Sequence, residues 1–348
     1  MAQINKPDTY FNTVLYTGNG STQSITGVGF QPDLIWSKGR SLAGFDHSVT
    51  DSVRGNTKRI FPSIVDAEAT CTVAVTSFDS DGFSLGDDNC ATLANLNNYN
   101  GQTYVNWLWK ANGAGSSNTD GSITSTVSAN TTSGFSIVSY TGTGSTATIG
   151  HGLGVTPKMI ITKNRSITET WRVYHTALGA GQALALNDVN ATDTDAAYWS
   201  NTAPTSTVFT VGTTAGTNGS GNSMIAYCFS EVKGFSKIGS YTGNGSTDGT
   251  FVYTGFKPAF IITKPTANIS SWNMTDVKRS TYNDGSLERL KSNTSDAETS
   301  TLNFDILSNG FKLRTTDNDY NPSGLNVIYM AFAENPLVGT NNIPATAR

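Results

Sequence analysis

The chain contains three histidines, His47, His151 and His175, which are the first candidates for a catalytic or metal site. None of them lies at the His-x-x-x-His or His-Glu-x-x-His spacing that brings two imidazoles to one metal ion. His175 stands 12 residues after Lys163, where a later copy of the same pattern has Asp276. A catalytic or metal role would not tolerate that exchange, so we expect no histidine to act in catalysis.

Acidic residues recur at matching places and could indicate glycoside hydrolysis, in which two carboxyl groups flank the scissile bond. Asp66 and Glu68 are matched by Asp296 and Glu298 in a later part of the chain. Such acids can also be turn or strand-edge residues that recur because the fold recurs. We favour this second interpretation, because a catalytic pair need not be repeated.

Two further acidic patterns also have structural interpretations. Asp51-x-x-Arg54 and Asp276-x-x-Arg279 match each other and indicate a structural ion pair. The segment 79–82, Asp-Ser-Asp-Gly, is similar to the start of a calcium loop but lacks its further oxygen ligands and its closing glutamate. A hairpin turn is the favoured interpretation, and we predict no catalytic residue, no cofactor site and no metal site.

Tryptophans are the remaining candidates for binding. Trp171 and Trp272 each follow a matching lysine by eight residues, and Trp199 lies in the polar segment 198–201. Exposed aromatic rings present an apolar face on which a sugar ring can stack. Burial in a core is the favoured interpretation. If the protein binds glycans, we expect these three tryptophans to stack on the sugar rings.

The three cysteines are too few for a disulfide framework and lack metal-ligand spacing. Cys228 lies in the apolar run 225–229 and is expected to be buried as a small apolar residue. Cys71 and Cys90 could lie near each other, but we expect them to be unpaired.

These side chains belong to a sequence that repeats three times. The motif Tyr-Thr-Gly-x-Gly-Ser-Thr occurs at residues 16–22, 140–146 and 241–247. Each copy is followed by a proline and then by an apolar strand that ends in a lysine, at Lys38, Lys163 and Lys264. Each unit closes on a second apolar strand, at 104–109, 224–229 and 327–332.

Composition agrees with a fold of many short strands. Only 14% of the 348 residues are charged, against about 25% in ordinary soluble domains, and glycine reaches 35 residues. Glycine and asparagine suit tight turns, while threonine and valine suit a pleated surface. We therefore predict an all-β fold of three tandem β-sandwich, jelly-roll-like repeats, each of about 100 residues.

The repeat predicts the division of the chain. We expect a first sandwich with a short N-terminal arm at 1–113, a flexible Gly/Ser/Thr linker at 114–133, a second sandwich at 134–233, a third at 234–338 and a tail at 339–348. The second and third units abut directly, so we expect them to pack rigidly together. The first unit is expected to be freer.

Charge and hydropathy exclude two classes of partner. A net charge of -4 without a basic cluster argues against nucleic acid. No apolar run approaches the roughly 18 residues of a membrane helix, so we expect no membrane insertion. The polar segment 1–10 lacks the apolar core of a signal peptide, and we expect synthesis in a cytoplasm without export.

The opening motif, the segment 78–83 and the closing segment 329–336 resemble repeat proteins of tailed bacteriophages, especially marine ones. Such proteins are usually labelled tail fibre or other virion structural proteins. The resemblance extends from about Tyr10 to Pro336. It implies a virion component that meets the host surface, and it transfers no catalytic residues.

The expected function is therefore that of a non-enzymatic virion structural protein, tail-associated as fibre, tip or baseplate, with host-receptor or glycan binding. Its expected partners are other virion proteins and further copies of itself, as a homotrimer, and its expected location is the virion assembled in the host cytoplasm. Two alternatives stay open: a capsid decoration or head-fibre protein, and a polysaccharide-degrading tail enzyme. The enzyme requires a cleft with two facing carboxylates that belong to one unit alone.

Overall fold

The computed structural model describes residues 3–280, 286–301, 303–335, 337–338 and 344–345. Its regular secondary structure consists almost entirely of antiparallel strands, which confirms the all-β fold. The described residues contain no helix of the length and apolarity needed to cross a membrane. The predicted C-terminal tail falls mostly outside the described residues.

The first unit, residues 11–109, is a sandwich of two sheets. Its larger sheet has the order β1 (Phe11–Thr17), β9 (Thr103–Trp109), β3 (Leu34–Gly39), β4 (Ser48–Asp51). Its smaller sheet has the order β2 (Gln23–Ile25), β8 (Gly82–Leu85), β7 (Val75–Asp79). A short ladder joins β5 (Lys58–Arg59) to β6 (Ala69–Thr70), and the 3-10 helix η1 (Pro7–Thr9) precedes the unit.

The second unit, residues 116–229, has the longest sheet. Its order is β10 (Ser116–Asn118), β11 (Ser125–Asn130), β12 (Phe135–Thr141), β19 (Ser223–Phe229), β14 (Met159–Asn164), β15 (Arg172–His175), β16 (Gln182–Ala185), β17 (Asp193–Thr194). The facing sheet pairs β13 (Ala147–Gly150) with β18 (Val208–Val211). Two single-turn helices complete the unit, α1 (Ala196–Trp199) and α2 (Ala215–Asn218).

The third unit, residues 236–333, returns to the pattern of the first. Its larger sheet has the order β20 (Ser236–Thr242), β28 (Asn326–Ala333), β22 (Pro258–Pro265), β23 (Asn273–Asp276), β24 (Leu287–Lys291), β25 (Thr299–Thr301). Its smaller sheet has the order β21 (Phe251–Tyr253), β27 (Gly310–Leu313), β26 (Phe304–Leu307). A last ladder joins β29 (Leu337–Val338) to β30 (Pro344–Ala345).

The three larger sheets share one strand order. The sequences β1-β9-β3-β4, β12-β19-β14-β15 and β20-β28-β22-β23 place corresponding stretches of the repeat side by side. In each unit the motif Tyr-Thr-Gly ends the first of these strands, and the matching lysine lies near the end of the third. Each unit has its own apolar core between its two sheets. The β-sandwich prediction is therefore confirmed.

The predicted linker at 114–133 is wrong, because β10 and β11 lie within it and extend the second sheet. β11 alternates between exposed Thr126 and buried Val127, and it pairs along its whole length with β12. Hydroxyl-bearing and β-branched residues suit such a strand as well as they suit a loop. Composition alone could not separate the two.

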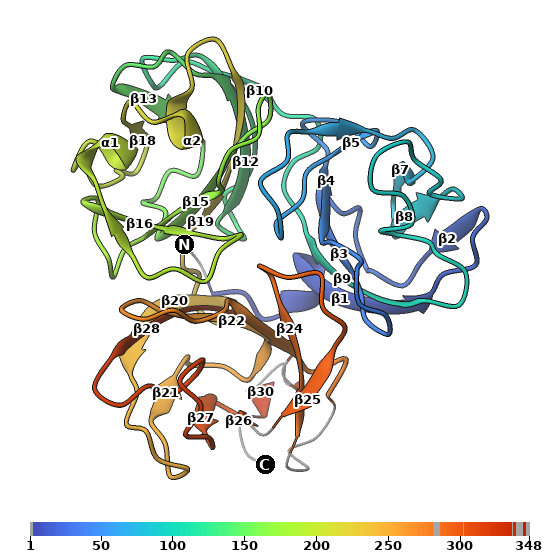
Figure 1. Cartoon of the computed structure of the whole chain (residues 1–348), viewed down its shortest axis with the longest axis vertical. Helices are drawn as coiled ribbons and strands as arrows, with labels where there is room; N and C mark the ends of the chain where they lie inside the picture. Colours follow the sequence, from blue (N-terminus) through green and yellow to red (C-terminus); the bar gives the residue numbers. More distant parts are fainter. Residues whose placement is uncertain (1–2, 281–285, 302, 336, 339–343, 346–348) are drawn as a thin grey trace.

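The three units surround a common centre, as Figure 1 shows, and their larger sheets turn one face toward it. The largest apolar cluster of the molecule lies there and draws on all three units. Its middle is a group of touching aromatic rings: Phe11, Trp109, Phe135, Phe229, Phe260 and Phe332. Burying each such ring stabilises the fold by about 1.5–3 kcal/mol. The expectation of a freer first unit is therefore wrong.

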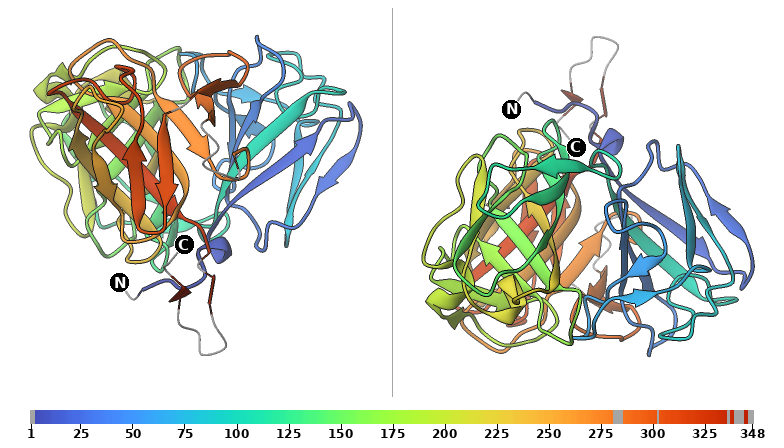
Figure 2. Two further views of the ribbon diagram at one scale, coloured as in Figure 1. Left: turned by 90° about the horizontal axis from the view of Figure 1, so that it is seen from below. Right: turned by 90° about the horizontal axis from the view of Figure 1, so that it is seen from above.

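The first described residues and the strands β29 and β30 leave the body on the same side, which we call the terminal end (Figure 2). The aromatic group lies toward this end, because Phe11, Trp109 and Leu34 meet where β1 begins and β9 ends. The lysine-bearing strands β3, β14 and β22 run from there to the opposite side, which we call the distal end.

Candidate functional site

The tryptophans singled out for glycan stacking are all buried. Trp171, Trp199 and Trp272 are each 1% exposed, which confirms the favoured prediction of burial. No ring face is open to a sugar, so the alternative of glycan stacking is wrong. Trp199 packs edge-on against Tyr174, with 5.9 Å between ring centroids, inside the second unit. The other two have a structural role between units. Trp171 donates its Nε1–H to Phe61 O at 2.9 Å.

Trp272 makes the same kind of bond to Ala185 O, at 2.7 Å, and joins the third unit to the second. His47 occupies the corresponding place in the first unit. Its Nδ1 accepts from Trp36 Nε1 at 2.9 Å, so its Nε2–H donates to Lys291 O of the third unit, also at 2.9 Å. Burial lowers the pKa of His47 well below its usual value, which keeps the ring neutral. We call the three interfaces between neighbouring units, each of which contains one of these hydrogen bonds, the seams.

The lysine of each repeat also belongs to a seam. Lys38, Lys163 and Lys264 are fully buried, and burial lowers the pKa of each to about 8. Each ammonium bridges a carbonyl of its own loop and a carbonyl of the preceding unit in the ring. The pairs of acceptors are Phe45 O and Ser295 O for Lys38, Glu169 O and Val65 O for Lys163, and Ser270 O and Val189 O for Lys264, at 2.6–3.4 Å.

The repeated carboxylates form ion pairs. Arg54 Nε lies 2.6 Å from Asp51 Oδ2, with both side chains fully buried, which confirms the predicted pair. Glu68 binds Arg54 at 3.2 Å and Arg165 of the second unit at 2.7 Å. Burial alone would raise the pKa of Glu68, but the two guanidinium groups lower it on balance. Asp66 is exposed.

The same network recurs between the third and first units. Arg279 Nε lies 2.6 Å from Asp276, and Glu298 joins Arg279 at 2.8 Å to Arg40 of the first unit at 2.7 Å. The seam between the second and third units uses a backbone bond instead, from Thr192 N to Thr266 O at 2.9 Å. The last unit thus closes on the first, and the chain is a ring of three head-to-tail contacts.

The repeated motif builds a rigid turn at the distal end. In the first unit the buried Asn98 donates to Ser21 O at 2.5 Å and accepts from Asn19 N at 2.9 Å, while Tyr16 OH donates to Asn97 O at 2.6 Å. Asn218 and Asn321 repeat these contacts in the other units. Sequence analysis missed these asparagines. Their signal was a similar distance from the fourth residue of the motif, which they follow by 79, 75 and 77 residues in the first, second and third units.

The segment 79–82 is a hairpin turn between β7 and β8, as expected. The Asp81 carboxylate accepts backbone N–H bonds from Gly27 at 2.9 Å and Gly29 at 2.7 Å, which lower its pKa. Gly82 has φ +153°, and a Cβ there would lie 1.9 Å from Ile25 O, so only glycine fits.

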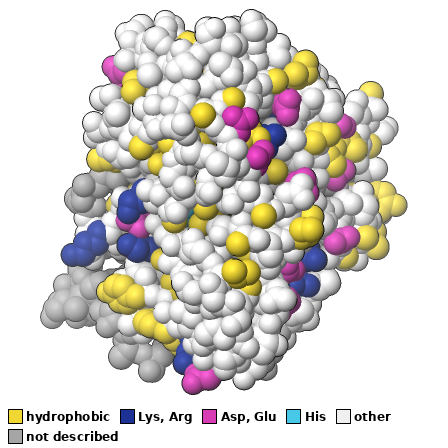
Figure 3. Space-filling model, turned by 60° about the vertical axis from the view of Figure 1, so that its left-hand side comes forward, with side chains coloured by type: hydrophobic (Ala, Val, Ile, Leu, Met, Phe, Trp, Pro, Cys, Tyr) yellow, Lys and Arg dark blue, Asp and Glu magenta, His cyan; other side chains and the backbone are white. Residues whose placement is uncertain are grey.

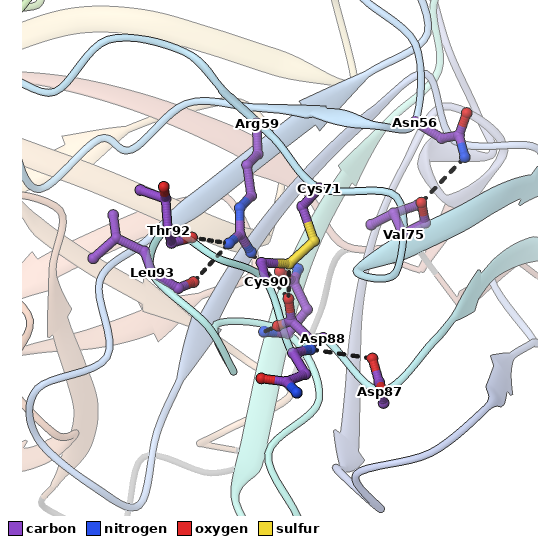
Figure 4. The surroundings of a disulfide bond; sticks show 11 residues. Asn56, Arg59, Cys71, Val75, Asp87, Asp88, Cys90, Thr92 and Leu93 are labelled. Carbon is purple, nitrogen blue, oxygen red and sulfur yellow. Dashed lines mark hydrogen bonds and ion pairs between the residues drawn. A yellow bond between two sulfur atoms is a disulfide. The ribbon is translucent and has the colours of Figure 1, made fainter.

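Cys71 and Cys90 form a disulfide, contrary to expectation, with 5.5 Å between their Cα atoms (Figure 4). The bond ties the loop after β8 to Cys71, the residue that follows the strand β6. The same loop is held by Arg59, whose Nη1 lies 2.9 Å from Asp88 Oδ1 and whose Nη2 donates to Leu93 O at 2.7 Å. Burial raises the pKa of Asp88 to about 6. The cluster is therefore a structural support.

Cys228 is buried, as expected. A cavity of about 420 Å³ opens at the terminal end between the first and third units. Asp8 and Glu334 both line it, and the Glu334 carboxylate is paired with Lys257.

The sequence profile of a family described as a domain of unknown function (DUF7483) matches residues 6–336. Searches among curated proteins and among solved structures find no match.

Proposed function

Because the chain belongs to the DUF7483 family, whose description carries no activity, we propose a function from its geometry: a non-enzymatic structural component of a larger particle. The setting we propose is the virion of a tailed bacteriophage, which the resemblance of the repeat motifs implies, with the tail as the place of attachment. In this arrangement the terminal end holds the chain on the particle. The distal end faces outward and meets the host surface.

The use of the polar groups in the seams carries this proposal. Asp51, Asp276, Glu68 and Glu298 each bind arginine, and none of the four lines the cavity that contains Asp8 and Glu334. Removing one partner of such a buried pair is strongly destabilising. Residues that hold the ring together in this way are committed to structure and are poor candidates for catalysis.

The surface supports a role in attachment and display. Figure 3 shows a face on which charged side chains are few and scattered among uncharged groups. At the distal end, asparagine and tyrosine side chains fix the motif turns, so neighbouring loops project from a rigid base. Rigid sandwiches that carry variable polar loops are a common plan for binding surfaces.

The ring also changes the proposed oligomeric state. The head-to-tail contacts that would join three subunits of a homotrimer are all made within one chain. We therefore propose that the chain is a monomer whose three units take the place of three subunits. Light scattering on the purified chain is then expected to give the monomer mass of 36.8 kDa. Three times that mass would support the homotrimer instead.

Immunogold labelling of intact virions with antibody against the purified chain tests the proposal. Label confined to the tail is the expected result. Label over the capsid would support a decoration or head-fibre protein, and virions without label would refute a virion role.

A second assay addresses the enzyme alternative. The cavity lined by Asp8 and Glu334 is the place where two carboxylates would act in such an enzyme. The purified chain is incubated with host polysaccharide, and reducing ends are measured. We expect none above background. Release that is lost in Asp8→Asn or Glu334→Gln would overturn the non-enzymatic proposal.

A further inference from the structure

Eight large apolar residues are exposed in the described part of the chain, and three of them lie in the same loop of the repeat, one in each unit. Leu42, Ile167 and Ile269 follow the seam lysines by four, four and five residues. They are 48%, 40% and 76% exposed. No other repeat position within the described ranges has an exposed large apolar residue in all three units.

The loops that carry these residues are held in place by the seams. In every unit the loop donates one backbone N–H to the neighbouring unit: Gly44 to Ser295, Glu169 to Val65 and Ser270 to Val189, at 2.8–2.9 Å. The lysine ammonium binds a carbonyl of the same loop from beneath. An apolar side chain on such a fixed loop loses little further conformational entropy when it binds.

The three loops lie at the same end of the molecule. β3, β14 and β22 begin beside the shared aromatic group at the terminal end, where Leu34, Met159 and Phe260 pair with Trp109, Phe229 and Phe332. They end at the loops, on the side away from the terminal end. One apolar tip per unit therefore stands at the distal end, arranged around the centre of the ring.

We propose that these tips dock into a homotrimeric protein whose three subunits each offer one apolar pocket, with its threefold axis on the axis of the ring. The proposal rests on the proposed function and names the partner of the distal end. The choice of partner follows from the threefold arrangement of the tips. Three equivalent tips match three equivalent pockets, whereas a monomeric partner would engage one tip and leave two apolar side chains in water.

A second copy of this chain is a poorer occupant. Its distal end would present three projecting tips to three projecting tips, and shape complementarity requires a pocket opposite each one. A glycan is also a poorer occupant, because aliphatic tips offer neither aromatic faces nor hydrogen-bond donors.

Photocrosslinking tests the proposal. Leu42, Ile167 or Ile269 is replaced, one at a time, by p-benzoylphenylalanine in the purified full chain, which is irradiated on isolated cell envelopes of the host bacterium. Tyr253, 62% exposed and apolar in only one unit, is the matched control position. We expect all three tips to crosslink the same segment of the same polypeptide, and position 253 not to.

Affinity for the same envelopes gives a second readout. Leu42→Asn, Ile167→Asn and Ile269→Asn should each weaken binding by a similar factor, about tenfold or more. Tyr253→Asn should leave binding unchanged. Because these positions are exposed, the midpoint of unfolding should not move in any of the variants.

Several results would overturn the proposal: different proteins or segments crosslinked from different tips, crosslinks to a second copy, no crosslinks, or a loss of affinity at one tip only. Its failure is distinguishable from that of the proposed function. Immunogold label absent from the tail, together with one common crosslinked segment, would refute the tail location and leave the threefold partner standing. Label on the tail together with unrelated crosslinks would refute the threefold partner and leave the tail location standing.

Discussion

Replacing Arg54 by leucine removes the guanidinium at the centre of the seam between the first and second units. Its Nε binds Asp51 at 2.6 Å, its Nη1 binds Glu68 at 3.2 Å, and its Nη2 donates to Val49 O at 2.9 Å. The Arg54 and Asp51 side chains are fully buried. The substitution therefore leaves a buried carboxylate without its counter-ion.

The expected cost follows from this burial. Removing one partner of a buried ion pair costs about 3–5 kcal/mol, because the remaining charge stays desolvated. Asp51 would keep the Tyr227 hydroxyl at 2.7 Å and two backbone N–H donors, which favours the lower half of that range. Unfolding entropy near 2.1 cal/mol/K per residue gives about 0.7 kcal/mol/K for 348 residues, so 4 kcal/mol corresponds to a fall in Tm of about 5–6 °C.

Urea unfolding followed by tryptophan fluorescence measures this cost, because the rings at the seams are buried. The second unit supplies a matched double variant, since it has His175 and Leu178 where the first has Asp51 and Arg54. The variant Asp51→His/Arg54→Leu should recover more than half of the loss.

An exposed pair of equal length provides the control. Arg314 lies 2.6 Å from Asp305 but is 38% exposed, so Arg314→Leu should cost less than about 1 kcal/mol. The reasoning is refuted if Arg54→Leu costs no more than Arg314→Leu. It is also refuted if the double variant is less stable than Arg54→Leu alone.

Two further perturbations address the seams and the disulfide. Burial lowers the pKa of Lys163 to about 8, so between about pH 8 and pH 9 the unfolded chain binds more protons than the folded one, and the free energy of unfolding should rise with pH by up to about 1.4 kcal/mol per unit for this lysine. Urea titrations across that range should show a smaller slope in Lys163→Met, and an unchanged slope would contradict the lowered pKa of Lys163. The disulfide joins cysteines 19 residues apart, so Cys71→Ser/Cys90→Ser should lose about 3 kcal/mol under oxidising conditions. In excess reductant the variant and the parent should unfold at the same urea concentration, and a persisting difference would assign the loss to packing.

The positions of the strands could be predicted from the sequence, but the closure of the three units into a ring could not. The motif Tyr-Thr-Gly and the lysine-ended strands fixed the positions of β1, β3 and their counterparts, because spacing and β-branched runs are properties of the chain itself. The seams depend on bonds such as Trp171 Nε1 to Phe61 O. A backbone carbonyl is present at every residue, so no residue type marks such an acceptor.

The other misses have related causes. The burial of Trp171 and Trp272 was predicted correctly, but their spacing gave no information on which neighbouring unit each indole contacts. The pairing of Cys71 with Cys90 depends on how the loop after β8 folds back, which two cysteines alone do not encode. For β10 and β11 the polar composition concealed the edge strand of the second sheet and its neighbour.

Joining three copies in one polypeptide has an evolutionary consequence. In a homotrimer, every substitution appears at all three places at once, so a change that suits one contact must suit the other two. Here each copy can mutate independently, and the second differs from the others: it has His175 and Leu178 in place of the Asp–Arg pair, and its sheet has the additional strands β10 and β11. Such a chain can specialise one third of its outer loops at a time and keep the remaining two as they were.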